Sequence, residues 1–192
     1  MSTLVCLLEE PSAKVLLEGV LPRLVPEGVL VRYLVFEGKQ DLERNVTRKL
    51  RAWRLPETQF VVLRDQDAGD CKIVKAKLAG LADSSGKPAL VRVACHELEA
   101  WVAGDLNALA MAFLVPAVAK EANRAKFRDP DSLVRPVEEI RRLLPTYQKI
   151  DGARRMGPLL DPDSNNSVSF RAFCSGVRKL FPVPVVSQVD SG

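Results

Sequence analysis

Acidic side chains stand directly after three of the four apolar runs in the first part of this 192-residue chain. The carboxylates in these positions are Glu9, Glu10, Asp65, Asp67, Glu97 and Glu99. Carboxylates that converge at one sheet edge repel one another by several kcal/mol unless a cation compensates them or one stays protonated. A divalent metal is the most economical way to hold them together.

The absence of a His or Cys cluster of metal-ligand spacing narrows the choice of ion. Carboxylate oxygens favour a hard ion, so Mg²⁺ or Mn²⁺ is the expected cofactor. Such an ion supports phosphoryl transfer, and a spared carboxylate serves as general acid or base. Asp65 and Asp67 are two residues apart, and in extended geometry both side chains point the same way, so we expect both to face one ion.

Helix capping is the alternative explanation for these acidic residues. Asp41 and Asp70 precede apolar helical patterns, and Glu9 and Glu10 precede Pro11, which suits a first helical position. For any single residue this alternative stays open. Three strand ends taken together favour the metal.

The elements that must position these residues alternate between strand and helix. Short runs rich in Val and Leu predict strands at 3–8, 29–36, 59–63 and 89–94. Helical periodicity follows each run, beginning near Pro11, Asp41, Asp70 and Glu97. Four βα units with nearly continuous apolar strands predict an α/β fold, with a parallel sheet of about four strands flanked by helices. In such sheets ligands bind beyond the carboxyl ends of the strands, where the acidic residues lie.

Beyond Asp105 the strand signal fades and a helical C-terminal part is expected. The predicted helices are 106–126, 132–144 and 167–180. We expect a single domain over 1–181, made of a βα core at 1–104 and a helical extension at 105–181. Residues 182–192 are expected to form a flexible tail.

Composition excludes several classes of protein. With 47% hydrophobic and 27% charged residues, the chain is typical of globular proteins. It shows neither a signal peptide nor a membrane-spanning run, so no membrane contact and a cytoplasmic location are expected. The four scattered cysteines suit free thiols. The net charge of +4 permits contact with nucleic-acid phosphates but is too common to demonstrate it.

Several segments of the chain resemble the DUF4276 family, a Toprim-like group often encoded beside AAA-type ATPases of bacterial defence loci. They are Leu7-Leu8-Glu9-Glu10-Pro11-Ser12-Ala13, Glu37-Gly38-Lys39-Gln40-Asp41-Leu42, Val61-Val62-Leu63-Arg64-Asp65-Gln66-Asp67 with Asp70-Cys71, Glu97-Leu98-Glu99-Ala100-Trp101, Tyr147-Gln148-Lys149 with Gly152-Ala153-Arg154, and Ser167-Val168-Ser169-Phe170. The resemblance spans nearly the whole chain and implies a Toprim-like, Rossmann-like fold.

The Toprim pattern is a glutamate after the first strand and an Asp-x-Asp after the third. The resemblance implies that Glu9, Asp65 and Asp67 match it, and that Glu99, two positions before Trp101, closes the set ahead of Glu97. These four carboxylates are the expected catalytic and metal-binding residues. Glu10 stands where many Toprim proteins have glycine, so the choice between Glu9 and Glu10 stays open.

Three functions are consistent with this pattern. The leading expectation is a Mg²⁺-dependent phosphodiesterase, a nuclease that acts on DNA or RNA in a phage-defence system with an ATPase partner. The second is a non-catalytic Toprim-like partner or regulatory module of an AAA-type ATPase. The third is a phosphatase or nucleotidyl-transfer enzyme for small nucleotides. The chain has no glycine-rich Walker motif and is not expected to bind ATP in P-loop fashion.

Four further side chains are candidates for contact with phosphate or nucleic acid. They are Lys39, His96, Arg48 and Lys72. Lys39 follows Gly38 in a turn beyond the second strand, and His96 adjoins the glutamates. Arg48 and Lys72 belong to basic helical faces that suit a phosphate backbone but equally suit a solvated surface.

Overall fold

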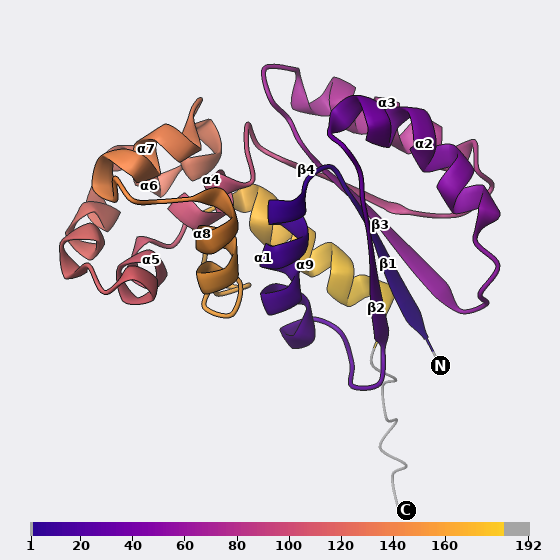
Figure 1. Cartoon of the computed structure of the whole chain (residues 1–192), viewed down its shortest axis with the longest axis horizontal. Helices are drawn as coiled ribbons and strands as arrows, with labels where there is room; N and C mark the ends of the chain where they lie inside the picture. The colour runs from indigo at the N-terminus through magenta and orange to yellow at the C-terminus, as the bar shows by residue number, and fades with distance from the viewer. Residues whose placement is uncertain (1, 183–192) are drawn as a thin grey trace, which may run out of the picture.

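A computed structural model describes residues 2–182 and has a parallel sheet at its centre (Figure 1). The four strands are β1 (Thr3–Leu8), β2 (Leu30–Val35), β3 (Thr58–Asp65) and β4 (Leu90–Ala94). Their order across the sheet is β2-β1-β3-β4, and every pair is parallel. The predicted α/β class and four-stranded sheet are therefore confirmed.

Helices cover both faces of the sheet, which explains the nearly continuous apolar strands (Figure 1). On one face lie α1 (Pro11–Val20) and α9 (Val168–Leu180), and on the other lie α2 (Lys39–Ala52) and α3 (Cys71–Asp83). Side chains of β1 alternate between the two cores, and all six residues of the strand are buried. The central position of β1 and β3 fixes the strand ends that carry Glu9 and Asp65.

The helices that follow the strands begin where the turn chemistry predicts. Pro11 occupies the first turn of α1, directly after Glu10. Gly38, with φ of 90°, precedes α2 and allows the sharp turn that leads into Lys39. Asp70 caps α3 by accepting hydrogen bonds from the N–H groups of Lys72 and Ile73, so the capping explanation holds for this residue.

The C-terminal part is helical, as predicted, but its helices are shorter and more numerous than expected. Besides α9 they are α4 (Glu99–Ala103), α5 (Leu106–Phe113), α6 (Ala125–Arg128), α7 (Pro136–Leu143) and α8 (Lys149–Met156), with 3-10 segments at Pro116–Asn123 and Pro130–Ser132. Most of them form a lobe beside the sheet (Figure 1).

Two boundaries in this part correct the sequence-based prediction. The single helix expected at 106–126 is wrong, because Leu114 adopts a left-handed conformation with φ of 56° and Pro116 then starts a 3-10 segment. The helix expected at 132–144 begins only at Pro136. A further helix, α8, was not predicted at all.

Helix α8 packs directly against α1, and this contact places its first residue at the sheet edge. Gly19 of α1 meets Gly157 so closely that a Cβ at position 19 would lie 2.5 Å from the Gly157 carbonyl carbon. Arg23 donates hydrogen bonds to the carbonyl oxygens of Gly157 and Leu160, at 2.5 and 2.7 Å. The close contact between α1 and α8 and the hydrogen bonds of Arg23 together fix the position of Lys149.

Three remaining expectations concern the membrane, the chain end and the cysteines. Within residues 2–182, no helix is long and apolar enough to cross a membrane. The tail expected at 182–192 lies outside the described residues, apart from Pro182. All four cysteines are free thiols, and Cys6 and Cys174 are buried.

Candidate active site

The carboxyl ends of β1 and β3 are joined by a hydrogen bond between neighbouring acidic residues. The backbone N–H of Asp65 donates to Oε2 of Glu9 at 3.1 Å. The N–H of Glu9 in turn donates to the carbonyl of Leu63 at 3.3 Å, which extends the parallel pairing past the strand. Glu9 and Asp65 are therefore held at one sheet edge, as the strand order requires.

Lys149, the first residue of α8, lies between two further glutamates. Its Nζ is 3.4 Å from Oε1 of Glu10 and 3.4 Å from Oε2 of Glu99. The Glu99 side chain is only 2% exposed, and its buried Oε2 accepts no hydrogen bond. Glu10 also accepts a hydrogen bond from the hydroxyl of Ser12. We call Glu9, Glu10, Asp65 and Glu99 the acidic cluster.

Burial and mutual repulsion shift the pKa values of the cluster upward. Burial raises the pKa of Asp65 well above its usual value, and the charges of Glu10 and Glu99 add to this effect. The pKa of Glu99 rises to about 7, mainly through burial and also through Glu10, although Lys149 opposes the rise. Burial likewise raises the pKa of Glu9. The surroundings of the cluster therefore disfavour its full ionisation, and a cation would favour the charged form.

Lys149 is the cation that this part of the structure supplies to the cluster. Burial alone lowers the pKa of Lys149, but the nearby carboxylates of Glu99, Glu10 and Asp65 outweigh that effect and raise it. Its charge therefore persists at neutral pH. The buried ring of Tyr147 packs against the backbone of α8 at Gly152. The contact is so close that any side chain at position 152 would overlap the ring.

Asp67 does not continue the extended backbone of Asp65 and is paired with two basic side chains, while its role as a metal ligand stays a prediction. The chain turns after β3, and Asp67 adopts a left-handed conformation with φ of 56°. Its Oδ2 lies 2.9 Å from Nζ of Lys39 and 3.4 Å from Nη2 of Arg64. The i and i+2 rule fails here because it requires extended backbone through residue 67.

Arg64 connects the two sides of this edge and was missed by the sequence-based reasoning. Its guanidinium is 6% exposed and lies 2.6 Å from Oε1 of Glu43, 3.6 Å from Oε2 of Glu9 and 3.4 Å from Asp67. Lys77 completes the contacts of Glu43 at 2.6 Å. A charged residue inside an otherwise apolar strand was the available signal, since buried arginines are nearly always paired.

Glu97 and Glu99 have different surroundings, and the structure separates their roles. Oε2 of Glu97 accepts a hydrogen bond at 3.2 Å from the N–H of Val137, in the first turn of α7. This carboxylate stabilises a helix N-terminus. Glu99, in contrast, reaches Lys149 and the acidic cluster. The preference for Glu99 over Glu97 as a metal ligand stays a prediction.

His96 shapes the backbone beside Asp67. It has φ of 56°, its N–H donates to Oε1 of Gln66 at 3.3 Å, and its carbonyl accepts from the N–H of Asp67 at 2.8 Å. Asp67 and His96 lie in two hydrogen-bonded loops and both occupy the left-handed region, and backbone strain of this kind clusters at functional sites. A cavity of about 530 Å³ opens here, lined by Gln66, Asp67, Ala68, His96, Glu97, Val134 and Arg135.

The other predicted phosphate contacts fall at different distances from the cluster. Lys39 lies at the site through its ion pair with Asp67. Arg48 donates to Oδ1 of Asn45 at 2.8 Å on the exposed side of α2, and Lys72 is exposed in the first turn of α3. Neither Arg48 nor Lys72 has a contact with the acidic cluster among residues 2–182.

The donor set of the acidic cluster fits a hard divalent ion in its chemistry. The candidate ligands are all carboxylates, and Oε2 of Glu99 is buried without a hydrogen bond. As the side chains stand, no group of three or more carboxylate, imidazole or thiol side chains within residues 2–182 is arranged to hold an ion. Metal binding by these carboxylates would therefore need a change in their side-chain conformations.

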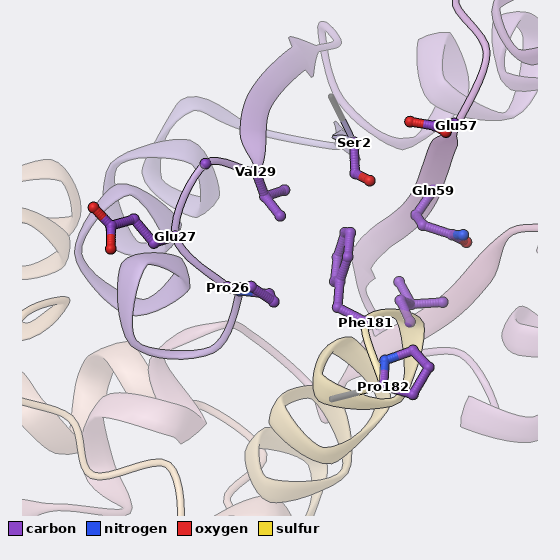
Figure 2. A pocket seen from close by; sticks show the side chains of 10 residues that line it. Ser2, Pro26, Glu27, Val29, Glu57, Gln59, Phe181 and Pro182 are labelled. Carbon is purple, nitrogen blue, oxygen red and sulfur yellow. The ribbon is translucent and has the colours of Figure 1, made fainter. Parts of the chain in front are cut away.

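Another cavity lies at the opposite end of the sheet. It measures about 650 Å³ and lies between the start of the strands and the end of α9 (Figure 2). Ser2, Val29 and Gln59 line one side and Phe181 and Pro182 the other. It contains no member of the acidic cluster, so volume alone does not identify the site.

Comparison with known proteins identifies one family. The sequence profile described as Domain of unknown function (DUF4276) matches residues 8–178. No curated protein and no solved structure matches the chain. The match begins at the last residue of β1, so it includes Glu9 and Asp65, and it extends through Lys149 into α9. The chain therefore belongs to the DUF4276 family.

Proposed function

We propose that the protein is a Mg²⁺-dependent phosphodiesterase that acts on DNA or RNA. The observation that carries this proposal is the buried Oε2 of Glu99, which accepts no hydrogen bond and shares the ammonium of Lys149, at 3.4 Å, with Glu10. One ammonium shared among several buried carboxylates leaves part of their charge uncompensated, which costs free energy. An arrangement that is unfavourable for the stability of the fold is typical of a functional site.

Glu9, Glu10, Asp65 and Glu99 are the residues that would hold the ion. Mg²⁺, or Mn²⁺ in its place, would polarise the phosphoryl oxygen and lower the pKa of a bound water. The role of the chain is to hold these oxygens at the ends of two central strands and one helix. Rigid strand ends suit this task, since metal ligands must keep their geometry during the reaction.

Lys149 would exchange its partners during binding. In the structure its ammonium group neutralises Glu10 and Glu99. When a divalent ion neutralises them instead, the ammonium is free to bind a phosphate oxygen and stabilise the charge that develops there. Lys39, which is half-exposed and paired with Asp67, lies where the flanking phosphate backbone would pass.

The setting of this activity follows from the resemblance. The parallel sheet, with Glu9 after β1 and Asp65-Gln66-Asp67 after β3, supports a Toprim-like fold. On this basis we propose a cytoplasmic protein of a bacterial phage-defence system that acts with an AAA-type ATPase.

Cleavage of plasmid DNA and of single-stranded RNA, with Mg²⁺, with Mn²⁺ and with EDTA, tests the proposal. The wild type should cleave at least one substrate only when the ion is present, and Glu99→Gln should not. Asp83→Asn is the matched control, because Asp83 is an exposed carboxylate at the far end of α3. Equal cleavage by wild type and Glu99→Gln would remove the basis of the proposal.

A non-catalytic partner module is the second candidate. Lys149 already compensates part of the cluster, and large apolar side chains of the helical part are exposed. Met111 is 62%, Leu114 87%, Val134 72% and Val168 60% exposed, which suits a protein contact. A stable complex with the ATPase, without cleavage under any of the conditions above, would favour this candidate.

A further inference from the structure

The two edges of the sheet differ in how well they are protected. At the β4 edge, Nη1 of Arg92 donates to the outward carbonyl of Val91 at 2.9 Å, and its Nε reaches the carbonyl of Ala172 in α9 at 3.1 Å. The β2 edge has no such cover among the described residues. Edge strands with unpaired backbone groups form ready sites for pairing with another strand.

The hydrogen bonds of β2 show which of its residues face outward. The N–H groups of Leu30 and Phe36 donate to β1, at the carbonyls of Ser2 and Leu8. Backbone groups of alternate residues point in opposite directions along a strand. Val31, Tyr33 and Val35 therefore direct their N–H and C=O groups away from β1. Val35 also leaves 38% of its surface exposed.

We propose that the β2 edge binds the β2 edge of a second copy, so that two sheets join in an antiparallel, two-fold dimer. Centring the pair on Tyr33 places Val31 of one copy opposite Val35 of the other. All three outward residues then form hydrogen-bonded pairs, which gives about six backbone hydrogen bonds.

Charge favours this register over its nearest neighbour. Centring the pair on Arg32 would set two arginines directly opposite each other, which destabilises a strand pair. It would also require the N–H of Val29, which already donates to the carbonyl of Pro26 at 3.3 Å. Centring on Tyr33 instead places Arg32 opposite the apolar Leu34.

Helix α2, beside β2, is self-complementary in charge under the same two-fold axis. A groove of about 320 Å³ along β2 is lined by Asp41 toward one end of α2 and by Arg48 and Lys49 toward the other. A second groove, of about 400 Å³, is lined by Lys14 and Glu18 of α1. An antiparallel axis brings the basic end of α2 toward the acidic end of its symmetry mate, while Lys14 and Glu18 pair with each other at 3.6 Å within α1.

The two grooves also extend the contact beyond the strand. A stable interface buries about 1,200–2,000 Å² in total, which is more than six strand residues provide. The active sites of the two copies would then open at opposite ends of an eight-stranded sheet. This dimer is independent of the proposed nuclease activity.

Sedimentation velocity and light scattering at micromolar concentrations test the dimer. The wild type should be dimeric, and Val35→Lys should raise the dissociation constant by at least about 100-fold, because each change acts twice. Leu159→Lys is the matched control, since Leu159 is also 38% exposed but lies beyond α8, and it should stay dimeric. A monomeric wild type, or an undiminished Val35→Lys dimer, would overturn the proposal.

Two further variants keep the register testable. Val31→Glu combined with Val35→Lys places opposite charges across both outer pairs and should restore the dimer. In any register other than the Tyr33-centred one, these two charges would not face each other and the dimer would not be restored. If the double variant does not fold by circular dichroism, Val35→Pro replaces it. This change removes only an outward N–H, which an edge strand tolerates, and should also give a monomer. A dimeric Val35→Pro variant would contradict the pairing.

Discussion

Two aspartates at the end of β3 stand two residues apart in very different surroundings. Asp65 is buried among Glu9, Glu10 and Glu99, and its pKa is raised by burial and by those neighbouring carboxylates. Asp67 is 38% exposed and paired with the cations Lys39 and Arg64. The same residue type is therefore destabilising when charged at one position and already compensated at the other. Of these two aspartates, Asp65 is therefore the one whose charge a metal ion would compensate.

The largest expected effect contrasts these two residues directly. Asp65→Asn should abolish metal-dependent cleavage, by at least about 100-fold, because it removes a charged ligand. Asp67→Asn should reduce cleavage by about tenfold, since it weakens the contacts with Lys39 and Arg64 but removes no member of the acidic cluster. Cleavage rates measured at saturating Mg²⁺ decide the order. Equal losses in the two variants would break the distinction between the two surroundings.

Lys149 should determine how strongly the stability of the folded protein depends on bound metal. Lys149→Met leaves Glu10 and Glu99 without their cation, and we expect the metal-free protein to lose about 2 kcal/mol of stability. Added Mg²⁺ should then raise the melting temperature more in this variant than in the wild type. Lys179→Met, at an exposed position in the last turn of α9, serves as the control. An unchanged melting temperature without metal would contradict the proposed role of Lys149.

The raised pKa of Glu99 makes stability depend on pH in a definite direction. Its ordinary value is 4.5 and its value in the folded protein is about 7, so the folded state binds more protons between these limits. Stability should therefore fall as the pH rises from 4.5 to about 7 and level off above. Glu99→Gln should flatten this part of the profile, measured by urea unfolding without metal. Parallel profiles for the two proteins would mean that Glu99 is ionised throughout.

Glu97 provides the smallest effect. Its carboxylate accepts from the N–H of Val137, so Glu97→Ala should cost about 1 kcal/mol of stability, as the loss of a helix cap does. Cleavage per folded molecule should not change. A loss of cleavage comparable to that of Glu99→Gln would show that both glutamates serve the site.

The sheet was predictable because helices cover both of its faces, so its strands appear as nearly continuous apolar runs. Val29 to Phe36 and Ala89 to Ala94 each exceed the observed strand by one residue or two. The helical part was less predictable. The left-handed turn at Leu114 contains no glycine, so the sequence did not indicate it. The short helix α8 contains Gly152, which lowers helix propensity. Tertiary contacts with α1 stabilise α8 instead.

The site was predictable in part for the same reason. Parallel strand order brings Glu9 and Asp65 to one edge, and this follows from sequence pattern alone. The direction of Asp67 did not follow, because it depends on a single left-handed residue. Lys149 could not be placed either, since it lies far along the chain and reaches Glu10 only through the packing of α8 on α1.

Calorimetric titration of Mg²⁺ and Mn²⁺ tests the central claim most directly, with the wild type, Asp65→Asn and Asp67→Asn compared in one buffer. We expect the wild type to bind the ions, Asp65→Asn to show no binding, and Asp67→Asn to bind with affinity close to that of the wild type. Loss of binding in Asp67→Asn with retention in Asp65→Asn would contradict the account, because the ion would then belong to the exposed side of the sheet edge.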